Sequence, residues 1–327
     1  VLALRNRQVA RELLASAKKT SRLTTATIDN IPATLATTIS TNENLLTQAV
    51  IGISSRTTAM ESYFDDIMSL PALAIPTPSK EFNAILNGGF GAGRLSILAS
   101  GPKMGKTTLA FWMTQKIAES GYPVIFVTYE LTELHLMQMV VARLTQMNSR
   151  ILDTRPWLTN PSAYGDELKS IKSAKDYYLT KIAPNLLIVE GDDKLTPGSL
   201  SGLVTQCRRD SGCGRKAPVL VVVDSLNKMS TGIVAIDRGA DAKARVGRVA
   251  KDLKALARST GGSVLAISEV TKEAHDAASS KGRYDMTCIR DSFEINHVAD
   301  VLMTMHSRQT EKSEKVKKGE NIYVLKK

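Results

Sequence analysis

Residues 88–108 read Gly-Gly-Phe-Gly-Ala-Gly-Arg-Leu-Ser-Ile-Leu-Ala-Ser-Gly-Pro-Lys-Met-Gly-Lys-Thr-Thr, and this stretch decides the fold. The apolar run from Leu95 to Ala99 has strand character. It leads into a turn that ends in Gly105-Lys-Thr-Thr108, and a helix-like run, Leu109 to Met113, follows. A strand, a glycine-containing loop, Lys-Thr and a helix, in this order, form the context of a phosphate-binding P-loop. In such a loop, backbone N–H groups and the positive end of the helix dipole face the phosphates.

The pattern also assigns the residues of the loop. We expect phosphate contacts from the segment Ser100, Gly101, Pro102, Lys103, Met104, Gly105, Lys106, Thr107 and Thr108. Lys106 would reach the β- and γ-phosphates, and the Thr107 hydroxyl would bind Mg²⁺. The first glycine of the usual G-x-x-x-x-G-K-[ST] pattern falls on Ser100, with Gly101 beside it. The alternative is an ordinary glycine turn that carries Lys-Thr by chance, and the flanking strand and helix argue against it.

Composition indicates a globular protein with a basic surface. The 327 residues suffice for one large domain, or for a large and a smaller one, and 43% of them are apolar, which is enough for a full core. The net charge of +11 favours a polyanionic partner, nucleic acid above all, although a merely soluble basic protein has the same balance.

The compartment follows from the cysteines and from the apolar runs. Cys207, Cys213 and Cys288 show no zinc spacing, and we interpret them as free thiols in a reducing compartment. No apolar run reaches the ~18 residues of a membrane span, and no signal peptide is visible. We therefore expect a cytoplasmic protein without membrane contact. Because the chain begins with Val1 rather than Met, we expect it to be part of a longer protein.

The chain divides into three segments. Residues 1–21 show the periodicity of a basic amphipathic helix. Residues 22–78 are rich in Thr and Ser, and we interpret them as a linker with short helices that ends in a proline-rich stretch. Residues 79–327 form the compact domain, so the sequence predicts a helical linker segment that precedes an α/β domain.

Strands alternate with helices throughout that domain. Continuous apolar runs, typical of strands buried on both faces, lie at residues 95–99, 124–129, 186–189, 219–223 and 263–267, with further strand candidates at 298–305 and 321–325. Helical patterns fill the intervals, and the longest covers residues 238–258. This alternation predicts a largely parallel central sheet covered by helices on both faces.

Polar residues follow four of these strands, namely Ser100, Glu130, Asp224 and Glu269. In open α/β sheets, ligands bind at the edge where the strands end. Asp224 has the setting of a Walker B acid, which would bind Mg²⁺ together with Thr107. Glu130 could activate an attacking water, and Glu269 could sense the γ-phosphate. For each of these carboxylates, an ordinary strand-end or capping role is the alternative.

Six short motifs occur in the order found in one known family. They are Leu86–Gly93, Ala99–Thr107, Tyr129–Leu131, Val221–Leu226, Leu253–Ala257 and Arg290–Val301. Through these motifs, residues 79–327 resemble the RecA-like ATPase domain of DnaB-type replicative helicases of phage or bacteria. The basic helix and linker at residues 1–60 are similar, more weakly, to the linker-helix region of that family.

The resemblance implies an enzyme, an ATP hydrolase that acts as a DNA helicase. It implies a homohexameric ring that uses ATP and Mg²⁺ to move along single-stranded DNA and to unwind forked DNA, with primase or a helicase loader as partners. Glu130 and Lys106 would be catalytic, and Glu269 would couple the ATP state to DNA. Arg290, Asp291 and Phe293 would lie in a DNA-contacting loop. The lysine of the family's trans-acting K-x-R element would be Lys326.

Three positions depart from the family pattern. Glu269 stands where the family usually has Gln, and Phe293 stands where its DNA loop usually has Gly. The arginine of the K-x-R element would fall one residue beyond Lys327. Two other functions remain open at this point. One is a RecA- or RadA-type recombinase or a helicase-loading ATPase, which binds DNA without unwinding it. The other is a non-catalytic structural or regulatory protein on the same fold.

Overall fold

A computed structural model places the central part of the chain. It describes residues 68, 74–210, 218–237, 239, 242–271, 274, 293–307 and 321–326. The expectations for residues 1–21, for most of 22–78, and for Arg290 and Asp291 lie outside these residues.

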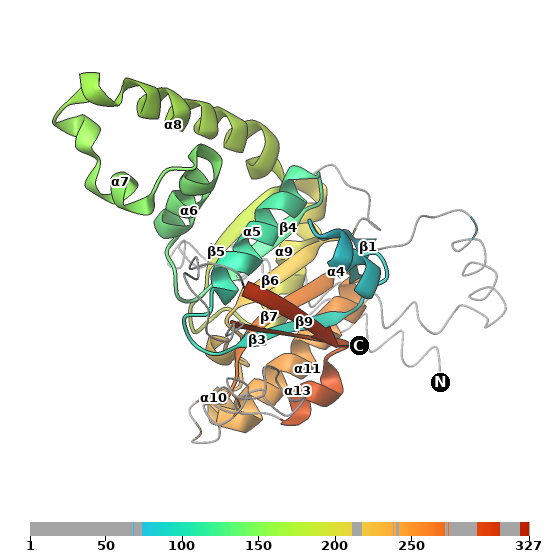
Figure 1. Ribbon diagram of the computed structural model, residues 1–327. Helices are drawn as coiled ribbons and strands as arrows, with labels where there is room; N and C mark the ends of the chain where they lie inside the picture. The colour runs from blue at the N-terminus through green and yellow to red at the C-terminus, as the bar shows by residue number, and fades with distance from the viewer. Residues whose placement is uncertain are drawn as a thin grey trace, which may run out of the picture.

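A seven-stranded sheet runs through the described part of the chain, in the order β5-β4-β6-β7-β3-β8-β9 (Figure 1). Six strands are parallel to one another: β3 (Leu95–Ser100), β4 (Val124–Thr128), β5 (Leu186–Glu190), β6 (Leu220–Asp224), β7 (Ser263–Glu269) and β8 (Val301–Ser307). The last strand, β9 (Asn321–Lys326), pairs antiparallel with β8. A separate two-stranded ladder joins β1 (Ala74–Ile75) to β2 (Phe90–Gly91). The predicted α/β fold with a largely parallel sheet is confirmed.

Helices cover both faces of this sheet (Figure 1). The α-helices are α4 (Lys80–Ile85), α5 (Lys106–Glu119), α6 (Glu133–Thr145), α7 (Ser149–Thr154), α8 (Gly165–Tyr177), α9 (Pro197–Asp210), α10 (Val234–Asp237), α11 (Ala242–Thr260) and α13 (Phe293–Val298). Short turns of other helical types are η2 (Pro156–Leu158), η3 (Pro161–Tyr164), η4 (Tyr178–Ile182), η5 (Ala183–Asn185) and η6 (Leu226–Lys228).

The core consists of two apolar layers, one on each face of the sheet. Alternate strand residues such as Ile97 and Val221 pack with α9, α11 and α13 in one layer. Residues of opposite parity, such as Leu98 and Phe126, pack with α5 and α6 in the other. Every residue of β3, β4 and β6 is buried, which explains why these strands appear in the sequence as unbroken apolar runs.

The predicted helix 238–258 begins later than expected, because α11 starts at Ala242. The preceding short helix, α10, ends at Asp237. Its carboxylate accepts hydrogen bonds from the Ser230 hydroxyl at 2.8 Å and from the Thr231 backbone N–H at 2.9 Å. Gly239 then bends the chain before α11. Side-chain hydrogen bonds that join a loop to a helix are not visible as an apolar period, so the sequence pattern indicated neither α10 nor the later start of α11.

The strand predicted at 298–305 also begins later than expected. Residues 293–298 form α13, whose Ile295 is fully buried in the core, and β8 starts only at Val301. Asp300 fixes that start, because its carboxylate accepts the backbone N–H of Leu95 at 2.7 Å and pairs with Lys254. An apolar run that serves a short helix first and a strand next has no single period, which is why this boundary was wrong.

No helix within the described residues is both long enough and apolar enough to span a membrane.

The aromatic pair between α5 and β4 offers a test of this core. Phe111 and Phe126 are fully buried, and their ring centroids lie 5.0 Å apart with the planes at 63°. We expect Phe111→Ala to lower the free energy of unfolding by about 3–5 kcal/mol, because it leaves a cavity under the P-loop helix. Urea denaturation followed by circular dichroism would measure the change.

The matched control is Leu158→Ala on η2, where the side chain is 73% exposed. Its effect should stay within about 0.5 kcal/mol. Equal stability of Phe111→Ala and the wild-type protein would contradict the packing described here.

Candidate active site

The P-loop connects the end of β3 to the start of α5. Gly105 precedes the helix with a φ of +86°, in the left-handed region that glycine adopts without strain. No side chain caps α5, whereas Ser79 and Thr132 cap the neighbouring helices α4 and α6. The first-turn N–H groups of α5 therefore remain available to an acceptor, as a phosphate site requires.

Lys106 lies across this loop. Its ammonium group donates hydrogen bonds to the backbone carbonyl oxygens of Ser100 at 3.1 Å and of Gly101 at 2.8 Å. Burial lowers the pKa of Lys106, and the nearby carboxylates of Glu269, Asp224 and Glu130 oppose that shift. The structure thus brings the loop lysine together with the three acidic residues that the sequence placed at strand ends.

Asp224 ends β6 and is only 2% exposed. Burial raises the pKa of its carboxyl group, while a hydrogen bond from Thr107 and the charges of Lys106 and Lys228 oppose the increase. Within the described residues, the Oδ2 atom has no hydrogen-bond partner. A buried carboxylate with an unsatisfied oxygen, beside a threonine hydroxyl, is a set of oxygen ligands that suits Mg²⁺.

Glu130 lies on a tight turn after β4. The Thr128 hydroxyl accepts the backbone N–H of Leu131 and donates to the Leu131 carbonyl, both at 3.0 Å, so the two residues between them form the tip of the turn. The backbone N–H of Tyr129 donates to the Asp224 carbonyl oxygen at 2.8 Å, which ties the turn to β6. The Glu130 side chain is 43% exposed, and its Oε1 atom lies 3.2 Å from Nζ of Lys228.

Glu269 ends β7 directly beside the start of the P-loop. It is the strand partner of Ser100 in the parallel ladder between β3 and β7. Its neighbour Ser268 is fully buried and donates a hydrogen bond of 3.3 Å to the side chain of Asn227 on η6. The ends of β7, β6 and β3 are therefore linked to one another around the position where the phosphates would lie.

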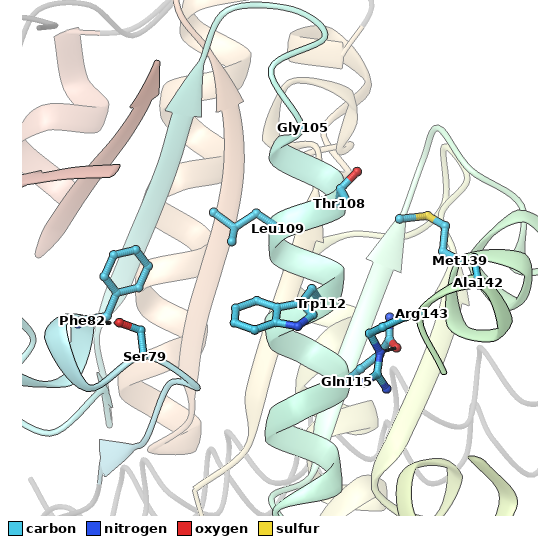
Figure 2. A pocket seen from close by; sticks show the side chains of 10 residues that line it. All are labelled: Ser79, Phe82, Gly105, Thr108, Leu109, Trp112, Gln115, Met139, Ala142 and Arg143. Carbon is cyan, nitrogen blue, oxygen red and sulfur yellow. Dashed lines mark hydrogen bonds between the residues drawn. The ribbon is translucent and has the colours of Figure 1, made fainter. Parts of the chain in front are cut away.

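An apolar cavity of about 670 Å³ opens on the other side of the P-loop helix, between α4, α5 and α6 (Figure 2). Gly105 and Thr108 of the P-loop form one end, and Arg143 lines it together with Gln115 from α5. The Arg143 Nε atom donates to Gln115 at 2.6 Å. None of Lys106, Asp224, Glu130 and Glu269 lines this cavity, so it is separate from the cluster of charged residues.

Comparison with known proteins identifies the family. The model of the "DnaB-like helicase C terminal domain" matches residues 74–327. The chain belongs to this family. The match contains all of the residues that the structure gathers around the P-loop.

Two individual relatives of this DnaB-like domain are named replicative DNA helicases. The replicative DNA helicase DnaB of Leifsonia xyli is 25% identical over 253 residues, which are 75% of this chain and 49% of that protein. The replicative DNA helicase DnaB of Treponema pallidum is 28% identical over 229 residues, which are 69% of this chain and 46% of that protein. The chain thus spans about half the length of the curated relatives it matches.

A solved structure supports the fold. A DnaB-like replicative helicase, described with its interactions with primase, aligns with a TM-score of 0.67 at 15% identity. The alignment covers 97% of this chain and 73% of that one. At this identity the likeness concerns the fold, which is the RecA-like arrangement that the motifs implied.

Of the residues expected to contact DNA or a neighbouring subunit, the structure describes the backbone of Phe293 and Lys326. Phe293 begins α13 rather than lying in a loop, and Arg290 and Asp291 lie outside the described residues. Lys326 ends β9 opposite Leu302, near the start of β8. Lys326 therefore lies at the amino-terminal ends of the parallel strands, whereas the P-loop of the same domain lies at their carboxyl ends. The action of Lys326 on a neighbouring subunit stays a prediction.

Lys228 is the member of the charged cluster that sequence reasoning missed. It lies four residues after Asp224, beyond the Walker B-like motif, and no sequence period marks it. Only the adjacency of β4 and β6 brings it to Glu130. The one available signal was a charged residue a few positions after a buried strand, two residues beyond the apolar Leu226.

Asp224 provides a test of this electrostatic arrangement. Because burial raises its pKa, ionised Asp224 opposes folding at every pH above the ordinary aspartate pKa, and this cost is lost as the pH falls toward that ordinary pKa. We therefore expect Asp224→Asn to melt at a higher temperature than the wild-type protein at neutral pH without Mg²⁺. The difference should shrink as the solution is acidified.

Thermal denaturation without Mg²⁺, at neutral pH and in acidified solution, would measure both effects. Asp166→Asn is the matched control, since that side chain is 95% exposed and should not change the melting temperature. A lower melting temperature for Asp224→Asn at neutral pH would show that ionised Asp224 is not costly in the fold.

Proposed function

We propose that this chain is the ATP-hydrolysing motor domain of a replicative DNA helicase. The observation that carries the proposal is the convergence of Lys106 and Thr107, at the start of α5, with Asp224 and Glu130, which follow the adjacent parallel strands β6 and β4. Family membership supports it, since two of the relatives that match are named replicative DNA helicases, while a third, shorter match is named a DNA repair protein RadA. The net charge of +11 is consistent with a nucleic-acid partner.

The residues of the loop would bind the triphosphate. The uncapped N–H groups at the start of α5 would donate to phosphate oxygens, as in other P-loops. The ammonium group of Lys106 would exchange the carbonyl oxygens of Ser100 and Gly101 for β- and γ-phosphate oxygens. Because Lys106 is half-buried, its charge acts there with less screening than at an exposed position.

Thr107 and Asp224 would hold Mg²⁺. The unpartnered Oδ2 atom of Asp224 and the Thr107 hydroxyl that contacts this carboxylate supply oxygen ligands. When bound, the cation would neutralise charge on the β- and γ-phosphates during transfer.

Glu130 would orient the attacking water. A carboxylate acts as a base only if it is held within hydrogen-bond distance of the proton it accepts. The turn fixed by Thr128 and Leu131 presents the Glu130 side chain on the same sheet edge as Asp224. Catalysis of this kind consists of positioning and electrostatic stabilisation, which a rigid set of strand ends supplies.

The proposal includes a homohexameric ring that encloses single-stranded DNA and unwinds forked DNA. In such a ring, Lys326 would act on the nucleotide of a neighbouring subunit. Its place at the far edge of the sheet in its own subunit is consistent with that role. A primase is a candidate partner, because the aligned DnaB-like helicase is described with one. Glu269 would sense the γ-phosphate from its position beside Ser100.

Removal of the Lys106 charge tests the enzymatic part. We expect Lys106→Ala to lower the rate of ATP hydrolysis by at least about 100-fold, because a preorganised cation at the phosphates is lost. A coupled assay of ADP release would measure it. The matched control is Lys116→Ala, ten positions later on the same helix and paired with Glu119 at 3.0 Å, which should keep the wild-type rate.

Wild-type turnover in Lys106→Ala would refute the assignment of the loop. No detectable ATP binding by the wild-type protein would favour a non-catalytic protein on the same fold.

Strand separation distinguishes a helicase from a recombinase or loader. We expect the protein to displace the labelled strand of a forked duplex when ATP and Mg²⁺ are present, and to form closed six-membered rings in electron micrographs with single-stranded DNA. Lys106→Ala should form rings but displace no strand. Open filaments, with DNA-stimulated hydrolysis but intact forks, would contradict the helicase proposal in favour of a recombinase.

A further inference from the structure

Glu130 is held by a lysine that the proposed mechanism does not use. The Nζ atom of Lys228 lies 3.2 Å from Glu130 Oε1. The described residues show no other hydrogen bond or ion pair to this carboxylate. The turn that carries Glu130 is fixed through its backbone, so the direction of the side chain depends on Lys228.

The backbone that carries Lys228 is itself anchored from three sides. Lys228 closes η6, where its N–H donates to the Ser225 carbonyl oxygen at 3.1 Å. The preceding residue, Asn227, accepts a hydrogen bond from Arg245 of α11 at 2.9 Å on its carbonyl oxygen, and one from Ser268 of β7 on its side chain. Lys228 therefore starts from a point that is fixed relative to β6, β7 and α11.

The pair cannot be explained by a contribution to folding. The Lys228 and Glu130 side chains are 50% and 43% exposed, and ion pairs this exposed add little to the free energy of unfolding. The charges of both side chains nevertheless reach the metal-site carboxylate, because Glu130 raises and Lys228 lowers the pKa of Asp224. The two side chains therefore act on Asp224 in opposite directions.

We infer that Lys228 is a positioning residue for Glu130: it binds Oε1 and leaves Oε2 directed to the water that attacks the γ-phosphate. This inference rests on the proposed function, because it needs Glu130 to be the base. A lysine suits the task, since its three donors rotate freely and can follow the carboxylate through small movements. Because the ion pair fixes one oxygen, the carboxylate loses less freedom when the water is bound.

Substitution by methionine tests the inference, because methionine retains most of the side-chain length without the charge. We expect Lys228→Met to lower kcat for ATP hydrolysis by about 10- to 100-fold, the effect typical of groups that orient a reacting residue. The KM for ATP should stay within about twofold of the wild-type value, because the phosphate contacts are unchanged. Lys228→Arg should restore most of kcat, since it restores the charge.

A double-mutant comparison separates positioning from other roles. In the Glu130→Gln background, Lys228→Met should cause no further loss, because the residue it positions no longer acts as a base. The matched control is Lys169→Met on α8, another exposed lysine that pairs with an acidic side chain, at 3.2 Å. It should keep the wild-type kcat, and all variants should melt at similar temperatures.

Three outcomes would overturn the inference. They are an unchanged or increased kcat in Lys228→Met, a kcat loss that Lys228→Arg does not restore, and an equal loss in the Glu130→Gln background. If Glu130→Gln itself hydrolyses ATP at the wild-type rate, the proposed role of Glu130 fails and the inference fails with it. If Glu130→Gln is inactive while Lys228→Met is fully active, only the inference fails.

Discussion

The parallel register of β4, β6, β7 and β3 is the constraint on which the site depends. Thr128 lies opposite Asp224 in the ladder between β4 and β6, and Ser100 lies opposite Glu269 in the ladder between β3 and β7. Parallel ladders repeat every two residues, so a slip of one residue would turn the Asp224 side chain to the other face of the sheet. The two apolar layers oppose such a slip, because it would move each residue of the strand into the layer that is packed around its neighbour. Core packing therefore determines where the charges lie.

This arrangement carries a cost that the rest of the domain offsets. Asp224 is almost fully buried, and one of its oxygen atoms has no partner in the described part of the chain. An unsatisfied buried carboxylate opposes folding, yet the same oxygen atom is the one that a cation would use. Strain and unsatisfied groups of this kind are tolerated where function requires them. The strands on either side, β4 and β7, are buried along almost their whole length and supply apolar contacts that offset the cost.

The features that the sequence predicted correctly are those encoded locally. The P-loop, the buried strands and the acid at the end of β6 each occupy one short stretch, so residue order alone indicates them. Lys228 could not be predicted in the same way, because its partner lies 98 positions earlier and the contact exists only when β4 and β6 are neighbours. The predicted starts of α11 and β8 were wrong for a related reason. Asp300 fixes the start of β8, and Asp237 ties the end of α10 to the preceding loop, through side-chain hydrogen bonds that leave no hydrophobic period.

The charge balance of the site favours the divalent cation that we propose for it. Three carboxylates, on Asp224, Glu130 and Glu269, face two ammonium groups, on Lys106 and Lys228. Their formal sum is −1, which would repel a triphosphate if the side chains acted alone. The uncapped start of α5 offsets only part of this repulsion, because a helix dipole is equivalent to roughly half a charge. A divalent cation on Asp224 changes the sign of the sum, so the same carboxylates that repel the free nucleotide would favour its magnesium complex.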